Sequence, residues 1–266
     1  MAAIAVVGHI EWVDFLRVAH LPDRGQITPA QRVRANAGGG AVVAAVTLAR
    51  LGADVDFFSA VGADALGERA IDELERHGVH PHLSRRPVTT RQVITLLEAG
   101  GERSIITIGE RLAPHGGDPL SWDRLERADG VYVTAADREA LHAARTATVL
   151  CATPRIAETL ADVDVAIDAL ILSASDPAEV AWAADLRDRA ALTVCTDGAA
   201  GGRWSGQSSG SWSATAPPGP VLDSYGAGDA FAAGFTYGLA VTGDPAEAAR
   251  IGAECGARAL TRPGGP

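Results

Sequence analysis

Short apolar stretches typical of buried strands alternate along the chain with stretches of helical periodicity, and no other feature of the sequence limits the fold as strongly. The strands are predicted at residues 3–7, 55–60, 130–134, 148–151, 166–173 and 192–196. The helices are predicted at residues 40–51, 66–77, 177–189, 227–240 and 245–260. Repeated strand–helix–strand units build a parallel sheet that helices cover on both faces. The sequence therefore predicts an α/β protein.

Two regions lack the intervening helices and predict a small β-sheet lid. Residues 10–18 with 26–34, and 91–97 with 104–108, alternate or hold β-branched residues. The Gly-Gly pair within residues 98–102 is a hairpin signal for the second region, and residues 204–212 predict a surface hairpin. No internal repeat or long linker divides the chain, so a single domain over residues 1–266 is expected.

The basic residues are all arginine, and this excludes several enzyme classes. The chain has 23 basic residues and no lysine. A P-loop, a Schiff-base enzyme and a protein kinase each need a lysine at the site. The single asparagine, Asn36, leaves little room for metal or phosphate sites built on asparagine.

The charge and the cysteines predict a cytoplasmic protein that binds neither nucleic acid nor membranes. The formal net charge is −10, whereas nucleic-acid binding usually needs a basic stripe. No apolar run is long enough to span a membrane, and residues 2–7 predict a buried strand, not a signal peptide. Cys151, Cys195 and Cys255 have no metal-ligand spacing and are expected to be buried thiols. Likewise, His80-Pro81 predicts a helix exit and a turn, not a metal site.

The strongest local signal is the string D-S-Y-G-A-G-D-A-F-A-A-G-F over residues 223–235. Gly226, Ala227 and Gly228 stand at the start of a predicted helix, where small residues let backbone N–H groups approach an anion. Asp229 falls in the first turn and could accept a proton from an attacking hydroxyl group. The bare pattern also suits an ordinary sharp turn followed by a helix-stabilising acid. The whole string, however, resembles the signature of the ribokinase-like, or PfkB, carbohydrate kinases.

A second stretch resembles the N-terminal signature of the same family. Gly38, Gly39 and Gly40 open a helix that ends in Leu-Gly, and paired glycines there allow a polyol to pack against backbone amides. The resemblance makes Gly38 and Gly39 candidate substrate-binding residues. Val43 departs from the pattern, because family members usually have a sugar-binding asparagine at that position.

Two further stretches correspond to the nucleotide end of the family's site. The turn after the strand at 192–196 resembles the family's phosphate loop, which makes Thr196, Gly198 and Gly201 candidate nucleotide-binding residues. The family's N-x-x-E motif is altered to Ser173 and Asp176 here. Asp176 could cap the helix that starts at Pro177, hold Mg²⁺, or do both.

The resemblance also implies an acidic, sugar-binding residue after the first strand. Glu11 and Asp14 are both candidates, and they point to opposite sides of an extended strand. We select Asp14, since it shares a face with Trp12 and an aromatic ring beside a carboxylate suits a sugar. The resemblance also assigns Asp223 to a loop that binds a monovalent cation such as K⁺.

Taken together, the resemblance covers nearly the whole chain. It implies a central, mostly parallel sheet flanked by helices, with a lid from about 10–36 and 88–108. It further implies ATP- and Mg²⁺-dependent phosphorylation of a sugar or polyol, with Asp229 as the base and residues 226–228 as the anion hole. A nucleoside kinase and a non-catalytic nucleotide- or sugar-binding regulator are the alternatives. The strand edges of the lid could pair with a second subunit.

Overall fold

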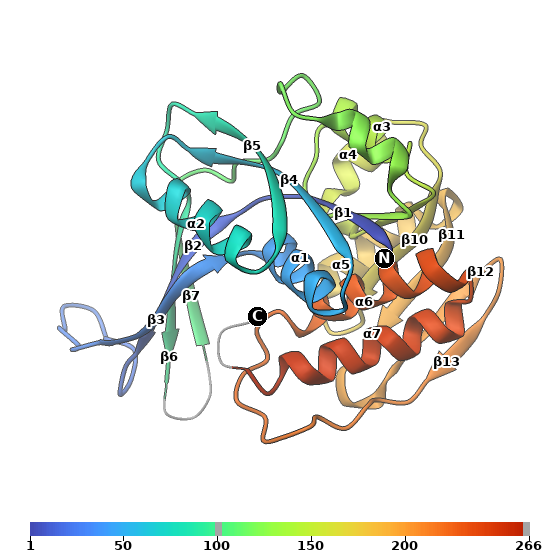
Figure 1. Cartoon of the computed structure of the whole chain (residues 1–266). Coiled ribbons are helices and arrows are strands. Elements are labelled where there is room, and N and C mark those ends of the chain that lie inside the picture. Colours follow the sequence, from blue (N-terminus) through green and yellow to red (C-terminus); the bar gives the residue numbers. More distant parts are fainter. Residues whose placement is uncertain (99–102, 263–266) are drawn as a thin grey trace.

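The computed structural model describes residues 1–98 and 103–262, and its main feature is a nine-stranded sheet (Figure 1). Seven neighbouring strands are parallel, and two strands continue the sheet in antiparallel fashion at one edge. In spatial order they are β13 (Gly210–Trp212), β12 (Gly202–Gly206), β11 (Ala190–Thr196), β10 (Ile167–Ser173), β9 (Val149–Ala152), β8 (Gly130–Val133), β1 (Ala3–Val7), β4 (Asp54–Gly62) and β5 (Val79–Arg86).

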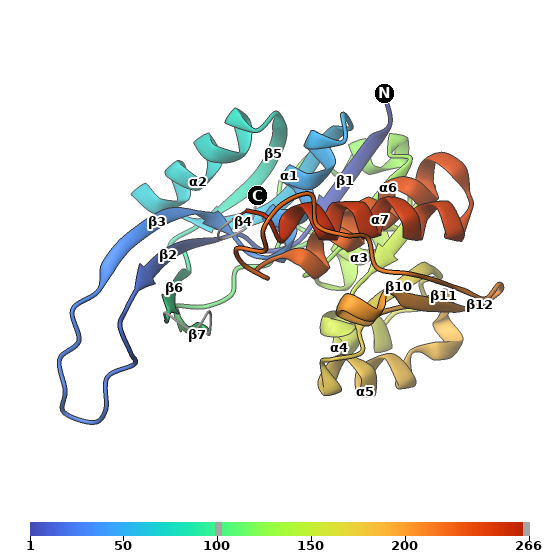
Figure 2. The same ribbon diagram turned by 90° about the horizontal axis from the view of Figure 1, so that it is seen from below.

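Helices cover both faces of this sheet (Figure 2). One face carries α1 (Gly40–Arg50), α2 (Ala65–Arg76), α6 (Ala227–Thr242) and α7 (Pro245–Ala259), and the other carries α3 (Arg138–Ala144), α4 (Ala157–Ala161) and α5 (Pro177–Asp185). Side chains of one strand alternate between the two layers. Ile4 and Val6 of β1 belong to the first apolar cluster, and Ala5 and Val7 to the second. The predicted α/β architecture is therefore confirmed.

Short 3-10 helices lie in four of the connections. They are η1 (Trp122–Arg127), η2 (Pro154–Ile156), η3 (Arg187–Arg189) and η4 (Gly198–Ala200). Among the described residues, no helix combines the length and the apolar character needed to cross a membrane.

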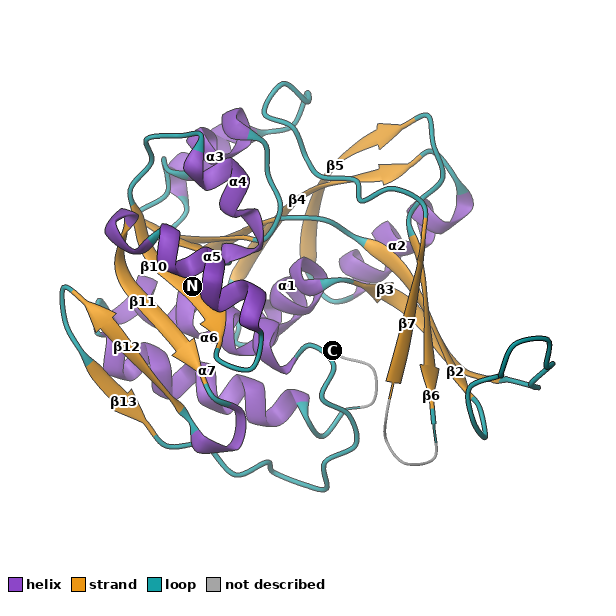
Figure 3. Cartoon of the chain, turned by 180° about the vertical axis from the view of Figure 1, so that it is seen from behind, coloured by secondary structure: helices purple, strands orange, loops and turns teal. Residues whose placement is uncertain are grey.

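A separate four-stranded sheet stands beside the main one (Figure 3). Its order is β3 (Gln31–Gly38), β2 (Glu11–Arg17), β6 (Gln92–Leu97) and β7 (Arg103–Ile108), with β2 and β6 parallel and both outer pairs antiparallel. The two regions that lacked helical periodicity thus form the predicted small sheet. The Gly-Gly turn expected between β6 and β7 lies outside the described residues.

Two local predictions differ from the structure. His80 and Pro81 lie within β5 and not in a turn, and the edge position of β5 tolerates a proline that has no N–H group to donate. His80 and His82 face Asp54 and Asp56 of the neighbouring strand. The predicted surface hairpin is β12–β13, but it extends the main sheet. Trp204 is buried there, and Trp212 stacks on Phe231 with ring centroids 5.1 Å apart.

Candidate active site

A cavity of about 780 Å³ lies where the carboxyl ends of the parallel strands face the small sheet and the start of α6. Each of five strands delivers a side chain to it at or just after its last residue. These side chains are His9 after β1, Thr134 after β8, Thr153 after β9, Ser173 of β10 and Thr196 of β11. Open α/β sheets generally bind ligands at this edge.

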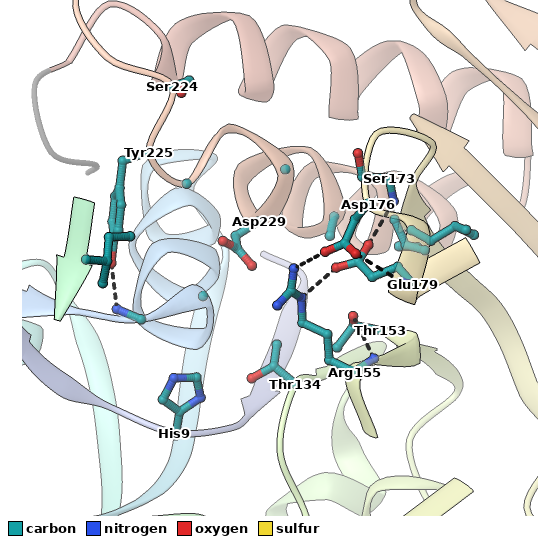
Figure 4. A pocket seen from close by; sticks show the side chains of 18 of the residues that line it. His9, Thr134, Thr153, Arg155, Ser173, Asp176, Glu179, Ser224, Tyr225 and Asp229 are labelled. Carbon is teal, nitrogen blue, oxygen red and sulfur yellow. Dashed lines mark hydrogen bonds and ion pairs between the residues drawn. The ribbon is translucent and has the colours of Figure 1, made fainter. Parts of the chain in front are cut away.

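Asp229 lies in the first turn of α6 and points into the middle of the cavity (Figure 4). Gly226 is the N-cap residue with φ of +73°, a left-handed conformation that suits glycine. Gly226 and Gly228 line the cavity, whereas Ala227 packs beside α7. The first turn of a helix leaves amide groups without intrahelical acceptors. The predicted anion hole and the predicted base therefore face the same space.

Burial raises the pKa of Asp229 from 3.8 to about 6. The nearby Glu179 carboxylate acts in the same direction, while Arg155 and Arg111 oppose the rise. A carboxyl group with a pKa near 6 is mostly ionised at neutral pH and is a stronger base than an ordinary aspartate. The environment of Asp229 therefore suits proton abstraction.

The start of α1 packs directly against this carboxylate. A Cβ atom at Gly40 would lie 2.3 Å from Oδ1 of Asp229, so only glycine leaves the carboxylate its room. Gly39 has φ of +94° and lines the cavity, and its amide donates a hydrogen bond to the Tyr225 hydroxyl at 3.0 Å. Gly38 is buried against Val13 and does not line the cavity.

Val43, which departs from the family pattern, lies outside this cavity. The Val43 side chain packs beneath Gly226, and a Cβ added at Gly226 would lie 2.9 Å from the methyl carbons of Val43. A sugar in the cavity described above would therefore meet groups other than the residue at position 43.

Arg155, whose charge acts on Asp229, pairs with two further carboxylates. Its Nη2 donates to Asp176 at 2.8 Å and its Nε to Glu179 at 2.5 Å. Asp176 also accepts hydrogen bonds from the amides of Ala178 and Glu179, so its predicted role as the N-cap of α5 is confirmed. Glu179 is buried and accepts the Ser173 amide at 2.9 Å. Both carboxylates are thus occupied within the protein.

The predicted nucleotide loop reaches the cavity through Thr196 alone. The Thr196 hydroxyl donates to the Leu172 carbonyl oxygen at 3.2 Å. Gly198 is exposed, and an added Cβ there would meet open space, although its φ of +49° favours glycine. Glycine at position 201 is explained by local packing, because a Cβ there would lie 2.1 Å from the Trp212 carbonyl oxygen.

The structure does not bring Trp12 and Asp14 to the cavity, contrary to the prediction. Both face away from it on β2: Trp12 lies under the Arg69 guanidinium, and Asp14 pairs with Arg32 at 3.0 Å. Glu11, on the opposite face, lines the cavity. Burial raises the pKa of Glu11, and Arg91 at 3.3 Å opposes that rise.

Asp223 lies beside the lid and contacts an arginine of β7. Its Oδ1 accepts the Tyr225 amide at 2.9 Å and pairs with Nη1 of Arg103 at 3.4 Å. An arginine therefore provides positive charge at the position that the resemblance assigned to a monovalent cation.

Several cavity residues have no counterpart in the sequence-based prediction. His9, Thr134, Arg91, Arg111 and Arg155 come from five separate segments. For three of these residues the available signal was position, since His9 and Arg155 follow closely on predicted strands and Thr134 is the last residue of one. The side chains of His9 and Thr134 are buried, and His9 Nδ1 and Thr134 Oγ1 have no hydrogen-bond partner within the described chain. Both residues line the cavity, so their unused hydrogen-bonding capacity lies at its wall.

Comparison with known proteins agrees with this geometry. The pattern of the family described as "pfkB family carbohydrate kinase" matches residues 1–265. Acarbose 7(IV)-phosphotransferase of Actinoplanes sp. is 47% identical over 81 residues, which cover 29% of this chain and 27% of that enzyme. The ATP-dependent ribose-1-phosphate kinase of Halopiger xanaduensis is 28% identical, with 99% of this chain and 94% of that enzyme covered.

Solved structures show the same fold. Microbiome-derived acarbose kinase Mak1 superposes with a TM-score of 0.82 at 26% identity, covering 98% of this chain and 93% of that one. Arabidopsis thaliana ribokinase, solved with ribose and ATP, superposes with a TM-score of 0.79 at 20% identity, covering 100% of this chain and 95% of that one. The ribokinase-like fold is confirmed. With the family pattern spanning nearly every residue, this chain belongs to the pfkB family of carbohydrate kinases, which are phosphotransferases.

Proposed function

We propose that this chain transfers the γ-phosphoryl group of ATP to a hydroxyl group of a sugar or related polyol, with Asp229 as the general base. The observation that carries this proposal is the position of Asp229. It stands in the first turn of α6, beside the open backbone of Gly226 and Gly228, with a pKa raised to about 6. A purely binding protein has no need of a buried base next to an anion hole.

The reaction follows from the two ends of the cavity. The acceptor hydroxyl lies against Asp229, its oxygen forms a bond to the γ-phosphorus, and its proton passes to the Asp229 carboxylate. The bond between the γ-phosphorus and the bridging oxygen breaks, and ADP leaves with that electron pair. The amides at the start of α6 stabilise the charge on the transferring group. Arg155, held by Asp176 and Glu179, adds a fixed positive charge nearby.

We assign nucleotide binding to the β11 end of the cavity. Thr196 would contact the phosphates of ATP there, with the exposed Gly198 turn beside it. We assign the acceptor to the lid end, where the buried His9, Thr134 and Glu11 offer polar atoms to hydroxyl groups. The substrate-binding carboxylate is thus Glu11 in this proposal, in place of Asp14. Gly39 borders the same space.

The predicted metal ions fit the site less well than ATP does. Both oxygens of Asp176 and both of Glu179 are engaged in hydrogen bonds or ion pairs. Among the described residues, no group of three His, Cys, Asp or Glu side chains could hold a metal ion. Asp223 faces Arg103. Mg²⁺ would therefore have to enter with the nucleotide, and no step of the reaction is assigned to Mg²⁺ or K⁺.

The exposed edge of the lid supports a dimer. β7 is the outermost strand of the small sheet, and Ile106 and Ile108 are about half exposed. Edge strands with apolar side chains tend to pair with another chain. We propose a homodimer through β7, which sedimentation of the protein and of an Ile106→Lys variant would test.

A cytoplasmic location likewise stays a prediction.

The test of the function is acceptor-dependent ADP release from ATP and Mg²⁺. The panel holds free sugars, sugar phosphates including ribose 1-phosphate, nucleosides and acarbose, and the Asp229→Asn variant is measured beside the native protein. Turnover that depends on an acceptor and disappears in the variant supports the proposal. Turnover with nucleosides alone favours the nucleoside kinase. ATP binding without any turnover leaves the regulator as the better description.

A further inference from the structure

The lid end of the cavity is rich in arginine. Arg91 precedes β6, Arg103 begins β7, and Arg111 follows β7, and all three line the cavity. The whole chain carries a net charge of −10, so this concentration of positive charge is local. A neutral sugar is bound by hydrogen-bonding groups and does not need three guanidinium groups.

The charges of these arginines are incompletely balanced by the protein. Arg103 pairs with Asp223 at 3.4 Å. Nε of Arg91 lies 3.3 Å from Glu11, but the geometry is poor and this buried nitrogen has no hydrogen-bond partner in the described part of the chain. Within residues 1–98 and 103–262, Arg111 has neither an ion pair nor a hydrogen bond. One full positive charge thus faces the cavity without an acceptor.

The charge of Arg111, which lies at the exposed rim of the cavity, acts on other groups that line it. Burial, followed by repulsion from Arg91, lowers the pKa of Arg111. Burial lowers the pKa of His9 to about 3, with further contributions from Arg111, Arg91 and Arg155. His9 therefore stays neutral at neutral pH. Grouped guanidinium groups that repel one another disfavour the empty site, and an anion among them would relieve that repulsion.

The position of these arginines assigns the anion to the acceptor. In Figure 4, Asp229 stands between Arg155, Asp176 and Glu179 on one side and His9 and Tyr225 on the other. The first side is the nucleotide end, where Arg155 is already engaged by two carboxylates. Arg91 lies 3.3 Å from Glu11, and the Arg103 guanidinium lies over the Tyr225 ring. The charges of Arg91 and Arg111 act on His9, so the three arginines belong to the second group. The charge of Arg155 also acts on Arg111 and His9, so the assignment of the three arginines to the acceptor rests on their contacts with this second group.

We infer that the acceptor is a sugar or polyol that already carries a phosphate group, bound by Arg91, Arg103 and Arg111. This inference rests on the proposed kinase function. A phosphate monoester offers three oxygens and close to two negative charges, which matches several guanidinium forks better than a carboxylate does. The existing phosphate takes no part in bond making. The hydroxyl receives the γ-phosphoryl group, Asp229 receives the proton, and the products are ADP and a bisphosphorylated compound.

Steady-state kinetics with matched acceptors tests this inference. The pairs are fructose and fructose 6-phosphate, and ribose and ribose 5-phosphate, with gluconate as a carboxylate of comparable size. We expect the phosphorylated member of a pair to have a kcat/KM at least ~100-fold higher, as expected for two or more charge-assisted hydrogen bonds. A preference for the free sugars, or for gluconate, overturns the inference and leaves the kinase function intact.

Arg111 provides the decisive variant because removing it breaks no hydrogen bond or ion pair within the described part of the chain. Arg111→Gln should raise KM for the phosphorylated acceptor at least ~10-fold and leave KM for ATP unchanged, and Arg111→Lys should restore part of the affinity. The control is Arg138→Gln, which removes the same charge from the exposed surface of α3. A rise in KM for ATP instead would assign Arg111 to the nucleotide and overturn the inference.

Calorimetry separates failure of this inference from failure of the proposed function. Fructose 6-phosphate, ribose 5-phosphate and inorganic phosphate are titrated into the protein saturated with ADP. If a probe binds to the native protein but not to the Arg111→Gln variant, and no acceptor is turned over, the anion site stands and the kinase function is rejected. Absence of binding to all three probes would reject the anion site, whatever acceptor is turned over.

Discussion

Replacing Asp229 with asparagine should reduce activity and raise stability, because the burial that tunes this carboxyl group also opposes folding. The pKa of Asp229 rises from 3.8 to about 6 in the folded protein. One pKa unit corresponds to about 1.4 kcal/mol, so the ionised carboxylate reduces the free energy of unfolding by about 3 kcal/mol above pH 6. Asparagine has nearly the same shape and carries no charge.

The sign of the pH dependence follows from the direction of this shift. A raised pKa means that the folded protein holds the proton more tightly than the unfolded chain does. The contribution of Asp229 to stability is therefore most favourable below pH 4 and is lost as the pH rises to about 6. At pH 8 the Asp229→Asn variant should unfold about 5 °C above the native protein, and at pH 4.5 about a third of that gain should remain.

Thermal unfolding at these two pH values and ADP-release kinetics measure both effects on the same samples. Turnover should fall by about 10²- to 10⁴-fold in the variant. In the native protein, kcat/KM should fall tenfold per pH unit below about pH 6, because the base becomes protonated. Asp123→Asn, at an exposed position outside the cavity, provides the same change of charge as a control. A stability gain that does not depend on pH would refute the argument from burial, and normal turnover would refute the assignment of the base.

Three further predictions follow from contacts in the cavity. The Gly40→Ala variant should fold normally, since alanine favours a helix, but its kcat should fall because the new methyl group displaces the Asp229 carboxylate. Additive effects of Gly40→Ala and Asp229→Asn in a double-mutant cycle would contradict this contact. Arg155→Met should move the acidic limb of the pH profile for kcat/KM to higher pH, because Arg155 opposes the raised pKa of Asp229; an unchanged limb would show that the two groups do not interact. Glu11→Gln should raise KM for the acceptor, whereas Asp14→Asn should change this KM far less. Equal effects of the two variants in steady-state kinetics would contradict the assignment of sugar binding to Glu11 in place of Asp14.

The fold was predictable because its signals are local and repeated. Strand and helix periodicities located all but one of the parallel strands of the main sheet and most of its helices. The exception was β5, where a proline suggested a turn although an edge strand can hold one. The composition of residues 204–212 predicted a hairpin but not its partner, because the three-residue turn between β12 and β13 carries no information about which strand lies alongside.

The candidate site was predictable only where several functional residues are consecutive. The string from Asp223 to Phe235 carries the proposed anion hole and Asp229 within one turn of one helix, so its geometry follows from local structure. His9, Thr134 and Arg111 are isolated residues from separate segments, and nothing in their immediate neighbours distinguishes them from other polar residues near strand ends. Only the folded sheet brings them to one cavity.

The sequence by itself determined the α/β architecture, the small second sheet and the glycine-rich start of α6, since each depends on residues that are neighbours in the chain. Only the tertiary structure decided which side chains line the candidate site. Alternation along β2 places Glu11 and Asp14 on opposite faces of the strand. Tertiary packing decides that the Glu11 face lines the cavity and that the face with Trp12 and Asp14 lies toward α2. The pKa of Asp229 is likewise a tertiary property, because burial and the charges of Glu179, Arg155 and Arg111 come from distant segments.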